Sequence, residues 1–114
     1  MIIIEEKDMK KRANEFEDLE FKIYKINDEP DYVRLSTIDI TEYKFTGYSL
    51  KNELKINDYI SGVIEEDNFR CKIRFEAIVT NITQKNNHFF YEIEFTKEVD
   101  LPEFLIAKSM AIAI

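Results

Sequence analysis

Glycine, proline and cysteine are scarce in this chain. Its 114 residues include two glycines, two prolines and one cysteine. So few glycines argue against tight glycine turns and against a glycine-rich loop that cradles phosphates. Because Cys71 has no second cysteine to pair with, no disulfide can form within the chain. This cysteine usage is typical of a reducing cytosol, so we expect a cytoplasmic protein.

Long apolar runs and an excess of positive charge are also missing. No apolar stretch approaches the roughly 20 residues that a membrane-spanning helix needs. Residues 2–4 are apolar, but Glu5 and Glu6 follow at once, so this start is too short for a signal peptide. The formal net charge of −7 repels nucleic acid and anionic lipid. We therefore expect no nucleic-acid binding and no membrane insertion, whereas a local basic patch could still hold a small anionic ligand.

Clusters of catalytic or metal-binding side chains are a further absence. His88 is the single histidine and falls at an expected turn, without the partners that catalysis or metal binding requires. Cys71 shares an apolar alternation with Ile73 and Phe75, so we expect a small buried hydrophobe and no nucleophile. The acidic residues 65–67 lack the spacing and the glycine of an EF-hand. The sequence thus predicts a protein that is not an enzyme and that has no metal and no cofactor.

Short amphipathic segments fill the middle of the chain. Hydrophobic residues make up 45% of the sequence and aromatic residues 13%, which suits the core of one domain. Apolar and polar residues alternate with the period of a half-buried strand. We expect strands at residues 19–26, 32–41, 44–50, 59–66, 71–79 and 89–95, with turns at 27–31, 65–68 and 85–88. Short strands joined by turns predict an all-β antiparallel barrel or sandwich.

The two ends of the chain differ from this middle. Residues 1–18 carry charges of both signs, and either a short helix or an ordered arm fits them. Asp100 and Pro102 have the residue types of a helix start, so residues 101–114 are expected to form a short C-terminal helix. Its apolar side chains would pack on the barrel or form a homodimer contact. We therefore divide the chain into an N-terminal arm (1–18), a barrel (19–100) and a C-terminal helix (101–114).

Asp39 and Thr41 stand out at the expected end of the second strand. Side chains alternate across a strand, so both are expected on the same face. A carboxylate beside a hydroxyl can accept hydrogen bonds from the N–H edge of a guanine. The alternative is a strand-end cap, in which both side chains bond the local backbone.

The segment that begins at Asp39 resembles the Asp/Asn-x-Ser-x-x-Gly motif of the PilZ domain, a small bacterial β-barrel that receives cyclic di-GMP. Residues 54–60, 74–79 and 91–95 are similar to other strands of that family, in the same order, and the resemblance covers roughly residues 10–108. It implies a small antiparallel six-stranded β-barrel with a short C-terminal helix. It also implies cyclic di-GMP as the ligand and control of motility or pili as the process.

Departures from the family pattern fall on the ligand-binding positions. Thr41 replaces the serine of the motif and Lys44 its glycine, with Gly47 three residues further on. The family's Arg-x-x-x-Arg arm is matched by Arg12 with Phe16, or by Lys11 with Glu15. Neither register supplies two arginines, whose planar forks bind phosphate and stack on guanine.

The loss of such contacts can be given a size. Each bidentate contact contributes about 1–3 kcal/mol, so one lost arginine and one repulsive glutamate weaken binding by roughly two to four decades. We therefore expect a non-catalytic PilZ-like adaptor with weak or absent ligand binding that acts through a protein partner. Any cyclic di-GMP would contact Lys11 and Arg12 through phosphate and Asp39 and Thr41 through guanine. The alternatives are a true receptor whose arm closes on the ligand, and an unrelated β-barrel structural or interaction subunit.

Overall fold

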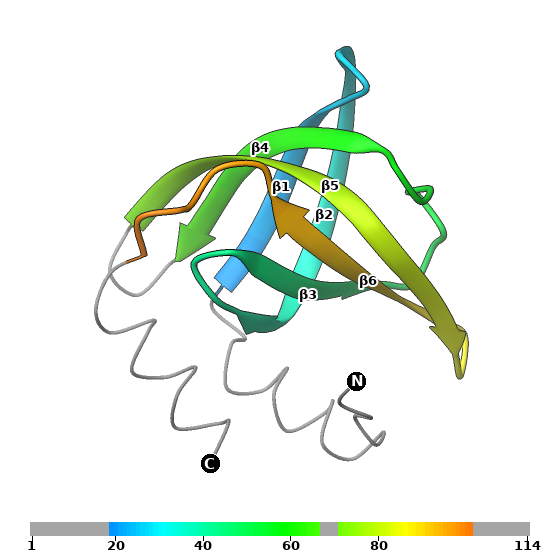
Figure 1. Cartoon of the computed structure of the whole chain (residues 1–114). Helices are drawn as coiled ribbons and strands as arrows, with labels where there is room; N and C mark the ends of the chain where they lie inside the picture. Colours follow the sequence, from blue (N-terminus) through cyan, green and yellow to red (C-terminus); the bar gives the residue numbers. More distant parts are fainter. Residues whose placement is uncertain (1–18, 67–70, 102–114) are drawn as a thin grey trace.

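Six antiparallel strands close into a barrel in the order β1-β2-β3-β6-β5-β4 (Figure 1). The computed structural model describes residues 19–66 and 71–101. The strands are β1 (Leu19–Ile26), β2 (Glu29–Ile40), β3 (Lys44–Ser49), β4 (Tyr59–Glu66), β5 (Cys71–Lys85) and β6 (His88–Phe95). The expected all-β fold and its six-stranded antiparallel barrel are confirmed. The expected arm (1–18) and C-terminal helix (101–114) fall, apart from Leu101, outside the described residues.

Aromatic and branched aliphatic side chains at alternate strand positions fill the barrel. Phe21 stacks on Phe45 with ring centroids 3.5 Å apart, and Phe75 meets the two rings edge-on at 5.5 and 5.8 Å. Their buried neighbours are Leu19, Ile23, Val33, Leu35, Ile40, Leu54, Ile60, Ile64, Ala77, Val79, Tyr91, Ile93, Val99 and Leu101. The period-two pattern of the sequence thus marks the inward face of the strands.

Two hairpins turn on asparagine and aspartate, which replace the missing glycines. Asn27 and Asp28 have φ angles of 53° and 65°, and Asn86 and Asn87 have φ angles of 52° and 64°. Two successive left-handed residues make the two-residue turn that suits a twisted hairpin, and Asn and Asp tolerate this conformation best after glycine. The turn expected at 27–31 is therefore shorter than predicted, and β2 already begins at Glu29.

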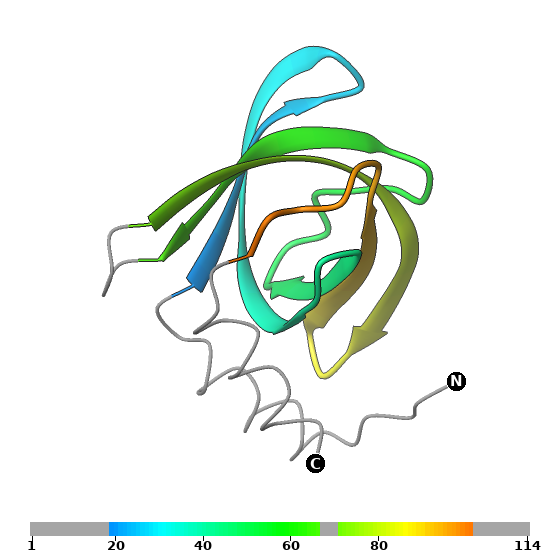
Figure 2. The same ribbon diagram turned by 60° about the vertical axis from the view of Figure 1, so that its left-hand side comes forward.

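Connecting segments cover both ends of the barrel (Figure 2). At one end, the chain after β6 crosses to the β2–β3 turn, where the Val99 amide donates to the Glu42 carbonyl oxygen (3.0 Å). At the other end, residues 50–58 place Leu54 in the core, and the Tyr91 hydroxyl donates to the Lys51 carbonyl oxygen (3.1 Å). We call the first end, formed by residues 41–43 and 96–101, the rim.

Candidate functional site

Asp39 lies near the end of β2, on the outer side of the barrel wall. Its half-exposed side chain is flanked by the buried Ile38 and Ile40, and its partner on β3 is Thr46. The Oδ1 atom accepts a hydrogen bond from the amide of Ile40 (2.9 Å). A carboxylate oxygen that accepts from the next amide is the local bond expected of a strand-end cap.

Thr41 follows β2 and holds the turn that leads to β3. Its Oγ1 accepts from the amides of Tyr43 and Lys44, both at 3.2 Å, and donates to the Lys44 carbonyl oxygen at 3.3 Å. One donor and two acceptor sites are all that a hydroxyl offers. The Thr41 hydroxyl is therefore committed to the turn in this structure.

The glycine missing from the motif is not supplied by Gly47. Lys44 is exposed at the first position of β3 and pairs with Glu94. Gly47 is buried within β3, between Thr37 on β2 and Tyr91 on β6. Gly47 therefore belongs to the barrel wall, and the turn between β2 and β3 contains no glycine.

The entry of the chain into the barrel lies beside this motif. The buried Thr37 hydroxyl donates to the carbonyl oxygen of Leu19 (2.9 Å), which joins the first residue of β1 to the last part of β2. Lys11 and Arg12 lie outside the described residues. Arg12 precedes Leu19 by seven residues, and seven residues span at most about 25 Å. Chain length thus permits Arg12 to reach Asp39.

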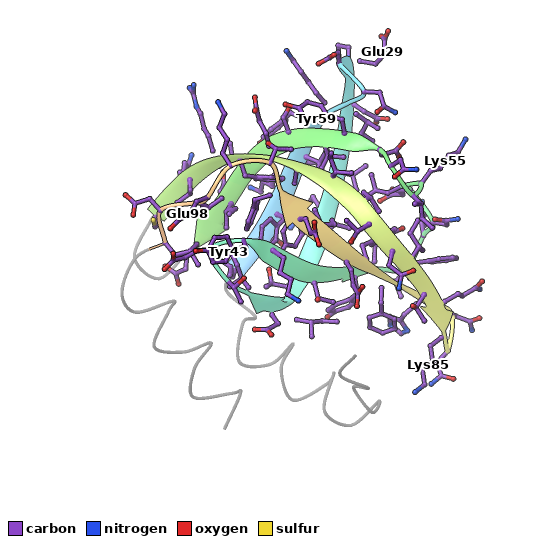
Figure 3. All side chains as sticks on the ribbon, viewed as in Figure 1. Glu29, Tyr43, Lys55, Tyr59, Lys85 and Glu98 are labelled. Carbon is purple, nitrogen blue, oxygen red and sulfur yellow. The ribbon has the colours of Figure 1, made fainter. Side chains whose placement is uncertain are left out.

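Negative charge gathers at the rim. The Glu98 carboxyl is hydrogen-bonded to Glu42 and raises the pKa of the Glu42 carboxyl, with further increases from burial and from the charges of Glu98 and Asp100. In Figure 3, Tyr43 and Glu98 lie at this end of the barrel and Glu29 lies at the far end. Carboxylates repel the phosphates of a cyclic dinucleotide. The order of residues along the chain did not indicate that these acidic side chains would meet at the rim.

His88 and Cys71 have the residue types that suit catalysis or metal binding. The Nδ1 of His88 donates to the Asn86 carbonyl oxygen (2.9 Å), since a carbonyl can only accept. Cys71 is half-buried at the start of β5, so the expectation of a buried hydrophobe is met only in part. Within residues 19–66 and 71–101, no three His, Cys, Asp or Glu side chains are grouped to hold a metal. That same part of the chain contains no helix long and apolar enough to cross a membrane.

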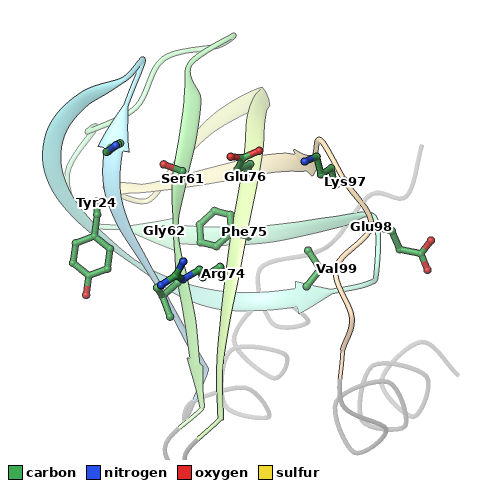
Figure 4. A pocket seen from close by; sticks show the side chains of 11 residues that line it. Tyr24, Ser61, Gly62, Arg74, Phe75, Glu76, Lys97, Glu98 and Val99 are labelled. Carbon is green, nitrogen blue, oxygen red and sulfur yellow. The ribbon is translucent and has the colours of Figure 1, made fainter.

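A hollow of about 610 Å³ extends over β4, β5 and residues 97–99. In Figure 4 its side chains point to different sides of the barrel wall: Tyr24 lies outside, whereas Phe75 and Val99 point inward. Its charged residues are of both signs, namely Lys25, Arg74 and Lys97 together with Glu76 and Glu98. Side chains that do not converge offer no single ligand a set of contacts.

A second groove, of about 580 Å³, lies where β2 and β3 separate. Its lining residues are Tyr32, Arg34, Ser36, Tyr48, Ser49, Leu50, Lys51, Glu53 and His88. Sequence reasoning missed this groove, because it depends on which residues of β2 and β3 pair. The alternation of exposed residues in β2 was its only sign in the sequence.

Comparison of the chain with family models, curated proteins and solved structures found no match. The fold and the site geometry described above are therefore the observations from which a function can be argued.

Proposed function

We propose that the chain is a cytoplasmic, non-catalytic PilZ-like adaptor in cyclic di-GMP signalling, with motility or pili as the controlled process. It binds the nucleotide weakly or not at all and acts through a protein partner. One observation carries most of the support. Asp39 lies near the end of β2 and Thr41 directly after it in a closed six-stranded barrel, and Thr37 of the same strand bonds Leu19, the residue that follows residues 1–18 in the chain.

Weak nucleotide binding is supported by three features. The Thr41 hydroxyl makes three bonds within its own turn and would have to exchange them for a guanine. The carboxylates of Glu42, Glu98 and Asp100 interact at the same rim. The sequence also places Phe16 or Glu15 where the family pattern has its second arginine.

Restoring the family pattern tests the proposal. The triple variant Phe16→Arg, Thr41→Ser, Lys44→Gly recreates the arginine pair around Arg12 and the full motif after Asp39. One regained bidentate contact, at about 1–3 kcal/mol, predicts that it binds cyclic di-GMP roughly 5- to 150-fold more tightly than the unaltered chain in calorimetry. The matched control replaces Phe16→Arg with Asn14→Arg, which has the same charge at the wrong spacing and is expected to leave binding unchanged.

Other results would favour the alternatives. If the unaltered chain binds at micromolar concentration, and Arg12→Ala and Asp39→Ala each weaken binding more than tenfold, it is a true receptor. If the triple variant binds no better than its control, the PilZ proposal fails and an unrelated barrel subunit remains. Light scattering of the full chain and of a version ending at Asp100 then tests the homodimer contact expected of residues 101–114.

A further inference from the structure

The hairpin of β5 and β6 continues past the end of β4. β5 pairs with β4 from Cys71 to Ile78, and the backbone of Val79 then bonds residues 57 and 58. Residues 81–85 pair with β6 and with no second strand of the described chain. In Figure 3, Lys85 lies at the far end of this hairpin. We call residues 81–85 the hairpin edge.

The backbone groups of the hairpin edge can be assigned to its two sides. Lys85 flanks the two-residue turn of the hairpin and bonds its partner across that turn. Because backbone groups alternate along a strand, Thr83 and Asn81 also bond β6. The N–H and C=O groups of Ile82 and Gln84 therefore point away from β6, where a further strand could bond them.

The hairpin edge lacks the features by which sheets prevent association. At the β1–β2 hairpin, Pro30 has no N–H to donate, and Glu29 and Asp31 are charged and exposed. The hairpin edge contains no proline and carries no charge from Asn81 to Gln84. One hairpin of the barrel is thus protected against further pairing, whereas the other is suited to it.

Charge is nearly absent from this hairpin, although the chain as a whole is highly charged. Charged residues make up 34% of the sequence, yet Lys85 is the one charged residue from 77 to 91. The net charge of −7 repels a second copy, but salt screens such repulsion beyond about 8 Å. Antiparallel pairing of two hairpins would place the two barrels at opposite ends of the contact. Repulsion between copies is therefore small at this edge.

The hairpin edge is complementary to itself. With Thr83 opposite the same residue of a second copy, Ile82 of each chain lies opposite Gln84 of the other, and their outward backbone groups meet. A Thr–Thr pair is favourable across two strands. Ile82 is partly buried within one chain, and in the pair it gains contact with the aliphatic part of Gln84.

Opposite charges meet at both ends of this pairing. Within one chain, Asn81 lies opposite the exposed Glu92 of β6. In the pair, Asn81 also lies opposite Lys85 of the other copy. Lys85 and Glu92 then lie two strands apart on the same face, with about 10 Å between their backbones, which the two side chains together span. Since the two-fold axis repeats this contact, a second copy supplies the charge that each end of the edge needs.

We propose that two copies of the chain pair antiparallel through the hairpin edge, with Thr83 at the two-fold axis, so that the two hairpins form one continuous sheet. A short strand buries less than the roughly 1,200–2,000 Å² of stable interfaces, so we expect a dissociation constant between about 10 μM and 1 mM. This inference goes beyond the proposed function and requires no nucleotide.

Sedimentation of the full chain over a dilution series tests the pairing. Gln84→Pro removes an N–H that β6 does not use, so the barrel should fold while the dissociation constant of the dimer rises about tenfold or more. Gln84→Thr keeps this N–H and is the matched control, with an expected change of less than about twofold. Circular dichroism checks that both variants keep their β-structure.

A disulfide between copies tests the register. In a Cys71→Ser background, Thr83→Cys places two thiols opposite each other, with the backbone spacing of about 4.5 Å that a disulfide accepts. Asn81→Cys, on the same face of the same strand, is the matched control, because its two copies would lie about 14 Å apart along the strands. Mild oxidation should link the Thr83→Cys chains at least about tenfold faster than the Asn81→Cys chains.

Exchange of the end charges tests the contact between copies. Lys85→Glu and Glu92→Lys each bring like charges together and should each weaken the dimer about threefold or more. The double variant restores opposite charges and should recover the dissociation constant of the unaltered chain. Such recovery separates a contact between copies from an effect of either variant on its own chain.

Four results would overturn the proposal. These are a chain that is monomeric at about 1 mM, a dimer that Gln84→Pro leaves intact, equal cross-linking of the two cysteine variants, and no recovery in the double charge variant. A dimer that Gln84→Pro leaves intact but that is lost in a version ending at Asp100 would assign the contact to residues 101–114 instead. Because no cyclic di-GMP is used, failure here leaves the Phe16→Arg test of the proposed function intact.

Discussion

The β1–β4–β5 wall and the β2–β3 side of the barrel are built differently. β1 pairs with β4 from Leu19 to Ile26, and β4 pairs with β5 along its whole length. β2 and β3 share only a short ladder from Ser36 to Ile40 and then separate. In the described part of the chain, the pairing between β2 and β3 is therefore shorter than the pairings of the wall.

The closed wall depends on a close approach of two strands at Gly62. A Cβ atom added there would lie 1.9 Å from the carbonyl oxygen of Lys22 and 2.9 Å from the Cα of Ile23. Neither contact is with a flexible side chain, so the strands would have to move apart. The difference between the two sides teaches that the wall tolerates an added methyl group at its glycine less well than the β2–β3 side does.

The largest expected effect comes from Gly62→Ala. Overlap with the backbone of β1 should lower the free energy of unfolding by about 3 kcal/mol or more, measured by urea denaturation. Gly47→Ala is the matched change on the β2–β3 side, where the nearest atom is the Leu35 Cβ at 3.2 Å. It should cost less than about 1.5 kcal/mol. Equal losses for the two variants would remove the distinction between the two sides.

A smaller effect is expected for Thr37→Val, at the junction of β1 and β2. The change removes the buried hydroxyl and leaves the Leu19 carbonyl oxygen without that donor, at a cost of about 1–3 kcal/mol in unfolding free energy. Thr80→Val removes a similar bond to the Glu92 carbonyl oxygen (3.0 Å) at an exposed site, where water replaces it. A loss at Thr80 as large as at Thr37 would contradict the role assigned to burial.

The smallest effect is a pH-dependent change at the rim. The pKa of Glu42 is raised above the ordinary glutamate value of 4.5, chiefly by the hydrogen bond with Glu98. The folded state therefore binds a proton more tightly than the unfolded state, and stability falls as pH rises above about 4.5. Glu42→Gln should raise the melting temperature at pH 7 and lose this advantage near pH 4.

Glu65 on the closed wall is the control of opposite sign. Its hydrogen bond from Lys22 lowers the pKa of the Glu65 carboxyl, so it contributes stability that is present above about pH 4.5 and is lost as pH falls through the lowered pKa. Glu65→Gln should therefore lower the melting temperature at pH 7. If both variants shift the melting temperature in the same direction, the inferred electrostatic difference between the rim and the wall is wrong.

The sequence predicted the strands best where one face is buried. The alternation at Phe75, Ala77 and Val79 located β5, but the prediction ended at residue 79 and the strand continues to Lys85. Residues 80–85 are mostly exposed, because they pair with β6 beyond the core. Strands without a buried face carry no alternation, so pattern reasoning cannot follow them.

The sequence predicted the residues of the candidate site but not the acidic residues that surround it. The strand expected to run to Thr41 ends one residue earlier, so Asp39 lies in β2 and Thr41 directly after it. The acids Glu42, Glu98 and Asp100 come together only because the chain after β6 crosses to the β2–β3 turn. Such proximity depends on tertiary topology, which residue spacing along the chain does not encode.

The strand order divides the barrel into two meanders, β1–β2–β3 and β4–β5–β6, which residues 50–58 connect. Each meander forms through local hairpins, and the long-range seams β1–β4 and β3–β6 then join them. Because pairing between distant parts of a chain is slow, docking of the two halves should limit the rate of folding. Before docking, each half would expose both of its outer strands, and a half from one molecule could pair with the complementary half of another.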